Sequence, residues 1–373
     1  MHVPGDLRAK LPAMKALLER LVRLETPSHD LHGLRAAQHA LADALNHEVG
    51  VGGSTMFVDT ANGPILDYTL PGDLAGETLL LGHMDTVYMR GAWSNLWRLD
   101  GDRAYGPGVY DMKGGLVQAA FALAAIADQR RRPSVRLLVT PDEETGSLAS
   151  REIIEEAARR ASRVLVLEPP ASDGALKVAR KGVGQFTLTF SGRAAHQGTE
   201  PELGANAVIE AARAVLTLLD LQDLAAGTTI GPNVISGGTV SNVVADSARL
   251  DVDVRVWTEA EAARVEAAVR SFITRDPRVL LVVDGGLNRP AMEPSAGALE
   301  IAAQARSIAE TLGFSIGIAR VGGASDGNFT APFAPTLDGL GAMGGEAHQR
   351  DREWVRLTEL PLRATLLAGL LVV

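Results

Sequence analysis

The spacing of apolar and polar residues predicts helices alternating with short, wholly apolar strands. Leu11–Leu24 and Leu34–Leu45 repeat apolar residues at helical spacing, so each predicts an amphipathic helix. The segment ETLLLGHMD (77–85) is a short apolar run typical of a strand buried on both faces. Segments 134–144 and 161–170 repeat this strand-then-polar pattern, with an Ala-rich helix expected at 114–130. This alternation predicts an α/β domain built on a largely parallel sheet flanked by helices.

A second pattern begins near Gly182. Strands are expected at 184–190, 228–238, 247–257 and 278–286, and helices at 205–219 and 259–273. Their order, β-α-β-β-α-β, is that of a ferredoxin-like α+β unit. Because helix-strand alternation resumes after Pro290, we expect an inserted domain at 182–290, with residues 1–181 and 291–373 forming the first domain.

Composition narrows the range of functions. The chain has 373 residues, a net charge of −9 and no cysteine. The acidic balance gives no reason to expect nucleic acid or an anionic membrane as partner. The absence of cysteine excludes disulfides, thiolate metal ligands and cysteine nucleophiles. The N-terminus lacks a signal-peptide core and residues 360–373 are too few to span a bilayer, so we expect a cytoplasmic protein with a buried terminal helix.

Candidate chemistry gathers where the predicted strands end. His83 and Asp85 follow one strand, the acidic run 142–144 follows the next, and Glu168 follows the third. Ligands of open α/β sheets bind beyond the carboxyl ends of the strands, so these groups are expected to converge on one crevice. Two Gly-rich loops add Asp111 and His348.

A crevice with several carboxylates needs compensating positive charge, and metal cations are the common solution. Oxygen and imidazole ligands suit Zn²⁺, Mn²⁺ or Co²⁺. One catalytic zinc needs about three protein ligands. Two histidines and three or more carboxylates are therefore enough for two metals that share a carboxylate.

Taken singly, each of these residues also fits a purely structural role. An isolated histidine after a strand is usually structural, the acidic run could be a solvated helix start, and Asp111 could be a helix N-cap. The glycine loops match neither a Walker loop nor a full GxGxxG motif. No strand end lies beside the other N-terminal histidines, which are His2, His29, His32, His39 and His47. The shared context of the set, rather than any one member, favours a metal site.

Read in order, the blocks GHMDTVY, GPGVYDMKGG, DEETGS, LEP, GRAAHQG and a late histidine resemble the M20 family of metallopeptidases. The resemblance covers nearly the whole chain and is nearest to the glutamate carboxypeptidase branch. It implies that His83 and Glu168 bind one metal, that Glu144 and His348 bind the other, and that Asp111 bridges both. It further implies that Asp85 orients His83 and that Glu143 is the general base.

The same resemblance gives the inserted domain the role of a lid and dimerisation domain. It implies a homodimer in which His196 crosses the interface to stabilise the oxyanion. Arg255 and Asn242 match residues near the substrate, Arg289 could meet a substrate carboxylate or form a structural ion pair, and Gly323 lies in a loop that resembles a substrate-binding loop. Gln197 and Ala324 depart from the family pattern, so the resemblance supports the type of reaction more strongly than it supports glutamate as the substrate.

The resemblance implies a hydrolase with two divalent ions, with Zn²⁺ as the first candidate and Co²⁺ or Mn²⁺ as alternatives. It would cleave an amide bond to release a C-terminal amino acid such as glutamate. The alternative is a deacylase of N-acyl amino acids, of the acetylornithine deacetylase or succinyl-diaminopimelate desuccinylase type. A binding protein without activity on the same fold is the third hypothesis, disfavoured because every metal and base position holds a competent residue.

Overall fold

The structure is a computed structural model that describes residues 5–129 and 131–372. Its contacts divide the chain into two compact units. Unit 1 comprises Met1–Val178, Pro294–Val321 and Ser325–Val373, and unit 2 comprises Ala179–Glu293 and Gly322–Ala324. Among the described residues, no helix is both long enough and apolar enough to cross a membrane.

Unit 1 is built on a six-stranded mixed sheet. Its strands, in spatial order, are β1 (Ser54–Thr60), β2 (Gly63–Leu70), β6 (Pro133–Thr140), β3 (Leu74–His83), β7 (Arg163–Val166) and β14 (Thr336–Leu337). The last four run parallel to one another, whereas β1 and β2 form an antiparallel hairpin at one edge. The predicted largely parallel sheet is confirmed, and its carboxyl ends are where the candidate residues lie.

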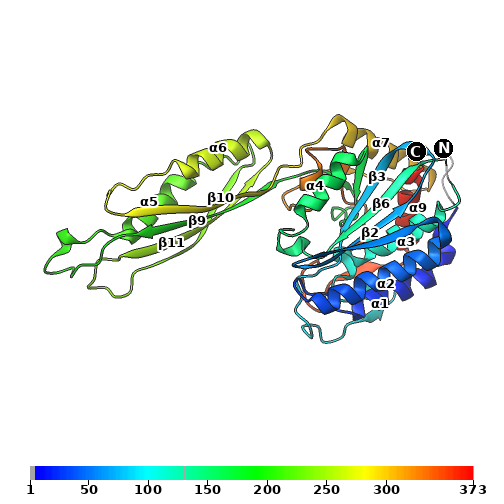
Figure 1. Cartoon of the computed structure of the whole chain (residues 1–373), viewed down its shortest axis with the longest axis horizontal. Helices are drawn as coiled ribbons and strands as arrows, with labels where there is room; N and C mark the ends of the chain where they lie inside the picture. The colour runs from blue at the N-terminus through cyan, green and yellow to red at the C-terminus, as the bar shows by residue number, and fades with distance from the viewer. Residues whose placement is uncertain (1–4, 130, 373) are drawn as a thin grey trace. The chain divides into compact units, whose positions relative to one another are not determined.

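Helices cover both faces of this sheet (Figure 1). One core cluster gathers residues from α1 (Leu11–Arg23), α2 (Leu31–Val49), α3 (Gly114–Ala125), α7 (Ala296–Thr311) and α9 (Glu359–Leu371). A smaller cluster on the other face includes residues of α4 (Arg151–Arg160) and α8 (Gly327–Thr330). Two apolar layers therefore hold the sheet in place and leave its strand ends free for polar residues.

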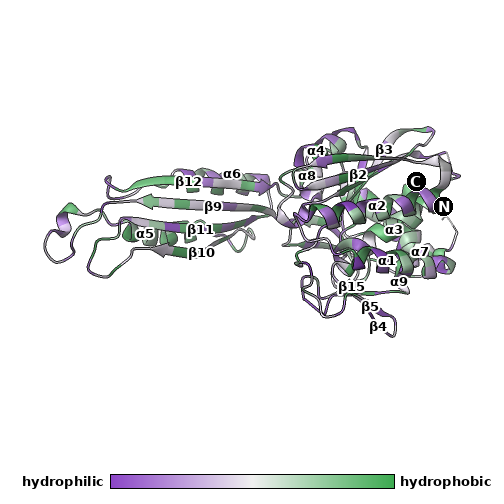
Figure 2. Ribbon diagram, turned by 60° about the horizontal axis from the view of Figure 1, so that its bottom comes forward, coloured by the Kyte–Doolittle hydropathy of each residue, from purple (hydrophilic) through white to green (hydrophobic). Residues whose placement is uncertain are grey.

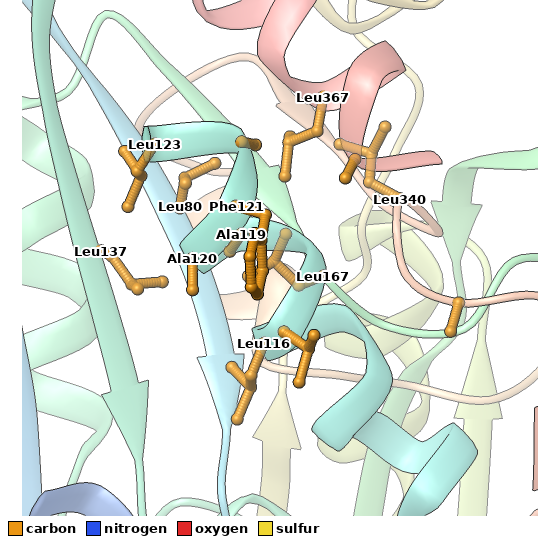
Figure 3. Packing of buried hydrophobic residues seen from close by; sticks show 14 of the residues in the cluster. Leu80, Leu116, Ala119, Ala120, Phe121, Leu123, Leu137, Leu167, Leu340 and Leu367 are labelled. Atoms are coloured by element: carbon orange, nitrogen blue, oxygen red, sulfur yellow. The ribbon is translucent and has the colours of Figure 1, made fainter. Parts of the chain in front are cut away.

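Helix α3 is the central element of the larger core. In Figure 3, Leu116, Phe121 and Leu123 lie among Leu80 and Leu137 of the sheet and side chains beyond it. Figure 2 shows hydrophobic colour along α3, where a solvent-facing helix such as α6 carries hydrophilic residues. The helix ends at Ala125 and not at Arg130, which lies outside the described residues. The burial of α3 fixes the loop that precedes it.

Very short strands join distant segments of unit 1. A four-stranded sheet contains β15 (Gly344–Gly345), β16 (Trp354–Arg356), β5 (Arg103–Tyr105) and β4 (Arg98–Asp100), and β8 (Leu176–Arg180) pairs with β13 (Ile318–Val321). The antiparallel pairing of β16 with β5 brings the late Gly-rich loop beside the one that carries Asp111. Single helical turns are η1 (Leu7–Lys10), η2 (Gly50–Gly52), η3 (Val109–Lys113), η4 (Glu143–Thr145) and η5 (Pro201–Leu203).

Unit 2 is an antiparallel four-stranded sheet with two helices. The strand order is β10 (Thr229–Gly237), β11 (Ser247–Val256), β9 (Gly182–Ser191) and β12 (Leu280–Arg289). Apolar side chains that alternate along β9 and β11 pack against α5 (Ala207–Leu219) and α6 (Glu259–Arg270). The element order matches the predicted ferredoxin-like unit, although α6 stops at Arg270, before the expected Ile273.

Candidate metal centre

The candidate ligands come from five segments of unit 1. His83 is the last residue of β3, Glu144 lies in η4 just beyond β6, and Glu168 follows β7. Because these strands are parallel, their ends bring the three side chains to one edge of the sheet. Asp111 lies in η3 before α3, and His348 lies in the loop between β15 and β16. The structure therefore brings together all five residues that the sequence predicted as ligands.

Asp111 lies between the two histidines. The Nε2 atom of His83 is 3.2 Å from Oδ1 of Asp111 and 3.4 Å from Oε1 of Glu168. The Nε2 atom of His348 is 3.3 Å from Oδ2 of Asp111 and 3.3 Å from Oε1 of Glu144. We call the first group the His83 site and the second the His348 site. The two oxygens of one carboxylate thus face one site each, as a bridging ligand would.

The carboxylates of the cluster favour the protonated, positively charged form of both histidines. Burial alone would lower the pKa of His83, but the neighbouring Asp111, Asp85 and Glu168 raise it well above its usual value. Asp111 and Glu144 raise the pKa of His348 to about 11. The pKa of Asp111 is lowered, because the two histidines outweigh the effect of its burial. The carboxylates therefore favour positive charge at both imidazoles.

Asp85 fixes the orientation of His83 through Nδ1, the ring nitrogen that does not face Asp111 and Glu168. Nδ1 of His83 lies 3.3 Å from Oδ1 of Asp85 and 3.0 Å from its carbonyl oxygen. The Asp85 carboxylate also accepts hydrogen bonds from the backbone N–H groups of Glu143 (3.1 Å) and Glu144 (3.2 Å). The Ser28 hydroxyl donates a further bond of 2.7 Å. Asp85 thus holds His83 and the acidic turn together. The sequence did not predict the role of Ser28, because it showed only that Ser28 precedes the second helix.

Glu143 also belongs to the cluster. Its carboxylate belongs with His83 and Glu168 to a group whose potential ligand atoms all lie within 4.8 Å of one another. The turn that carries it is held from behind by two buried aspartates. Asp142 accepts hydrogen bonds from Asn62 (3.0 Å), from the backbone of Ala149 (2.9 Å) and from the Ser150 hydroxyl, and Asp326 accepts from Thr140 (3.0 Å) and the Ser147 hydroxyl. The position of Glu143 is therefore set by a buried hydrogen-bond network.

Glu353 is a further residue that sequence analysis missed. It is fully buried and accepts hydrogen bonds from the backbone N–H groups of Tyr110 (2.9 Å) and Asp111 (3.1 Å) and from the Tyr88 hydroxyl (2.7 Å). Burial raises the pKa of Glu353 to about 7, although these three donors oppose the shift. Its only sequence signal is its place five residues after His348.

The remaining predicted site residues all lie in unit 2. Nδ1 of the exposed His196 accepts a hydrogen bond from the backbone N–H of Gly198 (3.1 Å), and Asn242 is exposed in the adjacent turn, where its carbonyl accepts from the backbone N–H of Gln197 (2.9 Å). Arg255 pairs with Asp253 at 2.9 Å, Arg289 is buried, and the carbonyl of Gly323 accepts from Arg180 (3.1 Å). The structure describes these residues within their own unit, and their roles at the metal centre remain predictions.

The donor set fits two divalent cations. Oε1 of Glu144 is buried at the His348 site and makes no hydrogen bond of ordinary geometry within the described part of the chain. Nε2 of His348 lies 3.3 Å away but not in hydrogen-bond geometry, and a buried oxygen without a well-formed hydrogen bond costs free energy unless a cation or another donor meets it. The side chains of the two sites are two imidazoles and three carboxylates, which are ligands that zinc and similar ions accept.

Comparisons with known proteins agree with this chemistry. The sequence model of peptidase family M20/M25/M40 matches residues 79–372. Carboxypeptidase G2 from Pseudomonas sp. (strain RS-16) is 31% identical over 97% of this chain and 89% of its own length. Succinyl-diaminopimelate desuccinylase from Alkalilimnicola ehrlichii is 28% identical over 72% of this chain and 74% of its own length.

A solved structure shows the same fold. The crystal structure of aminopeptidase PepT from Bacillus cereus ATCC 10987 superimposes with a TM-score of 0.80 at 21% identity, over 97% of this chain and 98% of that one. The sequence match spans more than half of the chain and includes every candidate ligand. This chain belongs to the M20 family of dinuclear metal-dependent peptidases and amidohydrolases.

Proposed function

We propose that this protein is a zinc carboxypeptidase that cleaves the amide bond before a C-terminal amino acid, with glutamate as the first candidate. The observation that carries the proposal is the position of Asp111 between two histidines, with Glu143 close to His83 and Glu168 in the same cluster. The 31% identity to carboxypeptidase G2 supports the choice of reaction.

His83 and Glu168 would hold one Zn²⁺, Glu144 and His348 the other, and Asp111 would bridge them. When bound, the ions supply a Lewis acid for the scissile carbonyl and lower the pKa of water toward neutrality. Glu143 accepts the proton of the attacking water and passes it to the leaving amine. Asp85 keeps Nδ1 of His83 protonated, so that Nε2 presents its lone pair to the cluster.

The substrate-binding residues are proposed to come from unit 2. Arg255 and Arg289 would meet the substrate carboxylate, since a guanidinium binds carboxylates with two parallel hydrogen bonds. Asn242 and Gly323 would add polar contacts, and His196 of a partner subunit would stabilise the oxyanion.

The partner subunit is a proposal supported by the exposed surface of unit 2. Strand β10 is an edge strand. Two of its apolar residues are exposed, Val234 at 56% and Ile235 at 50%. Beside it, α5 exposes Ile209 and Leu216, which are seven residues apart and so share one helix face. An edge strand next to an apolar helix face suits a homodimer contact.

The alternative function is deacylation of an N-acyl amino acid. It is favoured by the 28% identity to succinyl-diaminopimelate desuccinylase. The metal centre would act in the same way, and only the groups that bind the acyl part would differ.

A hydrolysis panel with a chelated control separates these functions. Zinc-loaded protein would be given acyl and dipeptide substrates ending in Glu, Asp, Ala, Leu and Lys, together with N-acetylornithine and N-succinyl-diaminopimelate, with free amine as the readout. We expect chelator-sensitive cleavage that prefers C-terminal Glu. Preference for an acylated intermediate would replace the carboxypeptidase proposal with the deacylase, and no turnover on any substrate would contradict both.

A further inference from the structure

Glu353 connects the loop that carries His348 with the segment that carries Asp111. Both residues are candidate ligands of the His348 site. Oε1 of Glu353 accepts both the Tyr110 and the Asp111 backbone N–H, at 2.9 Å and 3.1 Å, while Oε2 accepts the Tyr88 hydroxyl. These three hydrogen bonds of the carboxylate come from the segment before α3 and the loop after β3. One of the two amides is that of Asp111 itself.

The backbone of Glu353 is anchored in the same region. Its carbonyl accepts a hydrogen bond from the N–H of Gly106 (3.3 Å), and its N–H donates to the carbonyl of Gln349 (3.1 Å). The next residue, Trp354, begins β16 and pairs with Tyr105 of β5. Glu353 is thus fixed to the chain before Asp111 through its main chain and to Asp111 through its side chain.

The loop that carries His348 needs such an anchor. Glu346, His348 and Asp351 all have φ near +60°, a left-handed conformation that residues with a side chain seldom adopt. Three such residues within six positions persist only where surrounding contacts hold them. Within the loop, the Asp351 carboxylate accepts hydrogen bonds from the backbone N–H (2.8 Å) and the hydroxyl (3.0 Å) of Ser94. At the end of the loop, Glu353 makes the contacts described above.

We propose that Glu353 is a positioning residue that holds Asp111 and the His348 loop in one arrangement and so sets the affinity of the His348 site for its divalent ion. Glu353 touches neither substrate nor ion and acts through the backbone of Asp111. Partners of metal ligands typically change metal affinity 10–100-fold when they are replaced. The inference rests on the proposed dinuclear centre.

The test is a calorimetric Zn²⁺ titration, with a competing chelator, of the full chain without metal. Glu353→Gln keeps one oxygen that can accept both amides, so we expect two ions bound with affinities close to wild type. Glu353→Leu removes the acceptor, and we expect the weaker ion to lose roughly 10–100-fold in affinity. Tyr88→Phe removes one donor and keeps the carboxylate, and we expect a smaller loss, which also provides a result if the Leu variant does not fold.

Glu210→Gln is the matched control, because Glu210 is also buried and accepts two backbone N–H groups, those of Arg275 and Asp276, within unit 2. It should leave both Zn²⁺ affinities unchanged. Wild-type affinities in folded Glu353→Leu, or an equal loss in Glu353→Gln, would overturn the proposal for Glu353 and leave the dinuclear centre standing. If the Leu variant does not fold, unchanged affinities in Tyr88→Phe would overturn it. A wild-type chain that binds fewer than two ions would overturn the proposed centre itself.

Discussion

Glu143 and Glu144 are adjacent in sequence, and each has a carboxylate oxygen within 4.8 Å of a ring nitrogen of His83. Oε1 of Glu144 lies 3.3 Å from His348, whereas the carboxylate of Glu143 gathers with His83 and Glu168. Both backbone N–H groups donate to Asp85, which fixes the turn between them. At the scale of the residue, the arrangement allows one carboxylate to bind an ion while its neighbour is kept for proton transfer.

Replacing Glu143 with Gln should separate these two tasks. We expect kcat to fall by about 10²–10⁴-fold, because an amide of the same shape cannot accept a proton at neutral pH. Metal content, measured by atomic emission, should stay at the wild-type value. Glu144→Gln is the comparison, and it should lose metal as well as activity. Near wild-type turnover in Glu143→Gln would exclude it as the general base.

Metal binding should release protons. In the metal-free protein the pKa values of His83 and His348 are raised, so both imidazoles stay protonated through neutral pH. An ion requires their neutral forms, so Zn²⁺ affinity should rise as pH increases from about 6 to 8. Calorimetry in buffers of different ionisation enthalpy measures the released protons, and His348→Ala should release fewer. An affinity that does not change with pH would contradict the raised pKa values.

The elements place these residues through close packing of backbone. In the first turn of α3, a Cβ added to Gly115 would lie 2.2 Å from the carbonyl oxygen of Leu167, the residue before Glu168. Only glycine lets the helix approach the end of β7 this closely. The contact couples the helix that follows Asp111 to the strand end that carries Glu168.

Gly115→Ala should therefore destabilise unit 1. Because backbone must move, we expect a loss of about 1–3 kcal/mol in the free energy of unfolding, together with weaker metal binding. Denaturant unfolding of the metal-free protein measures the first effect. Gly317→Ala is the control, since its new Cβ would meet Ala175 at an ordinary 3.5 Å. Equal stability of the two variants would show that α3 shifts without cost.

Elements with a strong pattern could be predicted from the sequence. The second halves of β3 and β6, and β7 after Arg163, are buried and mostly apolar, and long helices show their period. The two- and three-residue strands β4, β5, β15 and β16 are too short for any periodicity. Without β16 against β5, no pattern of hydrophobic and polar residues indicated that the loop of His348 lies beside that of Asp111, and only the family resemblance implied it.

The same limit applies to the candidate site. Strand ends alone pointed to His83, Asp85, the acidic run 142–144 and Glu168, because parallel strands end at one edge. The proposed division of ligands between two ions came from the family resemblance, and the distances around Asp111 agree with that division. Ser28 and Glu353 act through hydrogen bonds to residues 57 and more than 240 positions away, which no local pattern records.

At the scale of the whole molecule, the proposed dimer can be tested through α5. Leu216 is 68% exposed, and Leu216→Asp would place a charge in the proposed interface. We expect sedimentation to show a monomer that keeps its metal and loses most activity. Ile273→Asp, at a position past α6 that is 80% exposed, is the control and should remain a dimer. A wild-type monomer would remove the proposed role of His196.

Mixed dimers test whether His196 acts on the partner subunit. A subunit with His196→Ala and one with Glu143→Gln are each expected to be inactive alone. In a mixed dimer, the intact Glu143 of one subunit would meet the intact His196 of the other. Random exchange should restore about a quarter of the wild-type rate. No recovery after verified exchange would indicate that His196 acts within its own subunit or not at all.

The division of unit 1 by unit 2 has a consequence during synthesis on the ribosome. Residues up to Val178 emerge first, but the core that they form also needs α7 and α9, which follow Glu293. At about 5–20 residues per second, the roughly 80 residues that separate Glu293 from the end of α9 take on the order of 4–16 s to translate. During that interval the main body of unit 2 can already fold, while apolar side chains of α3 await their partners. The nascent chain therefore passes through a stage in which chaperones have a binding surface that the finished protein lacks.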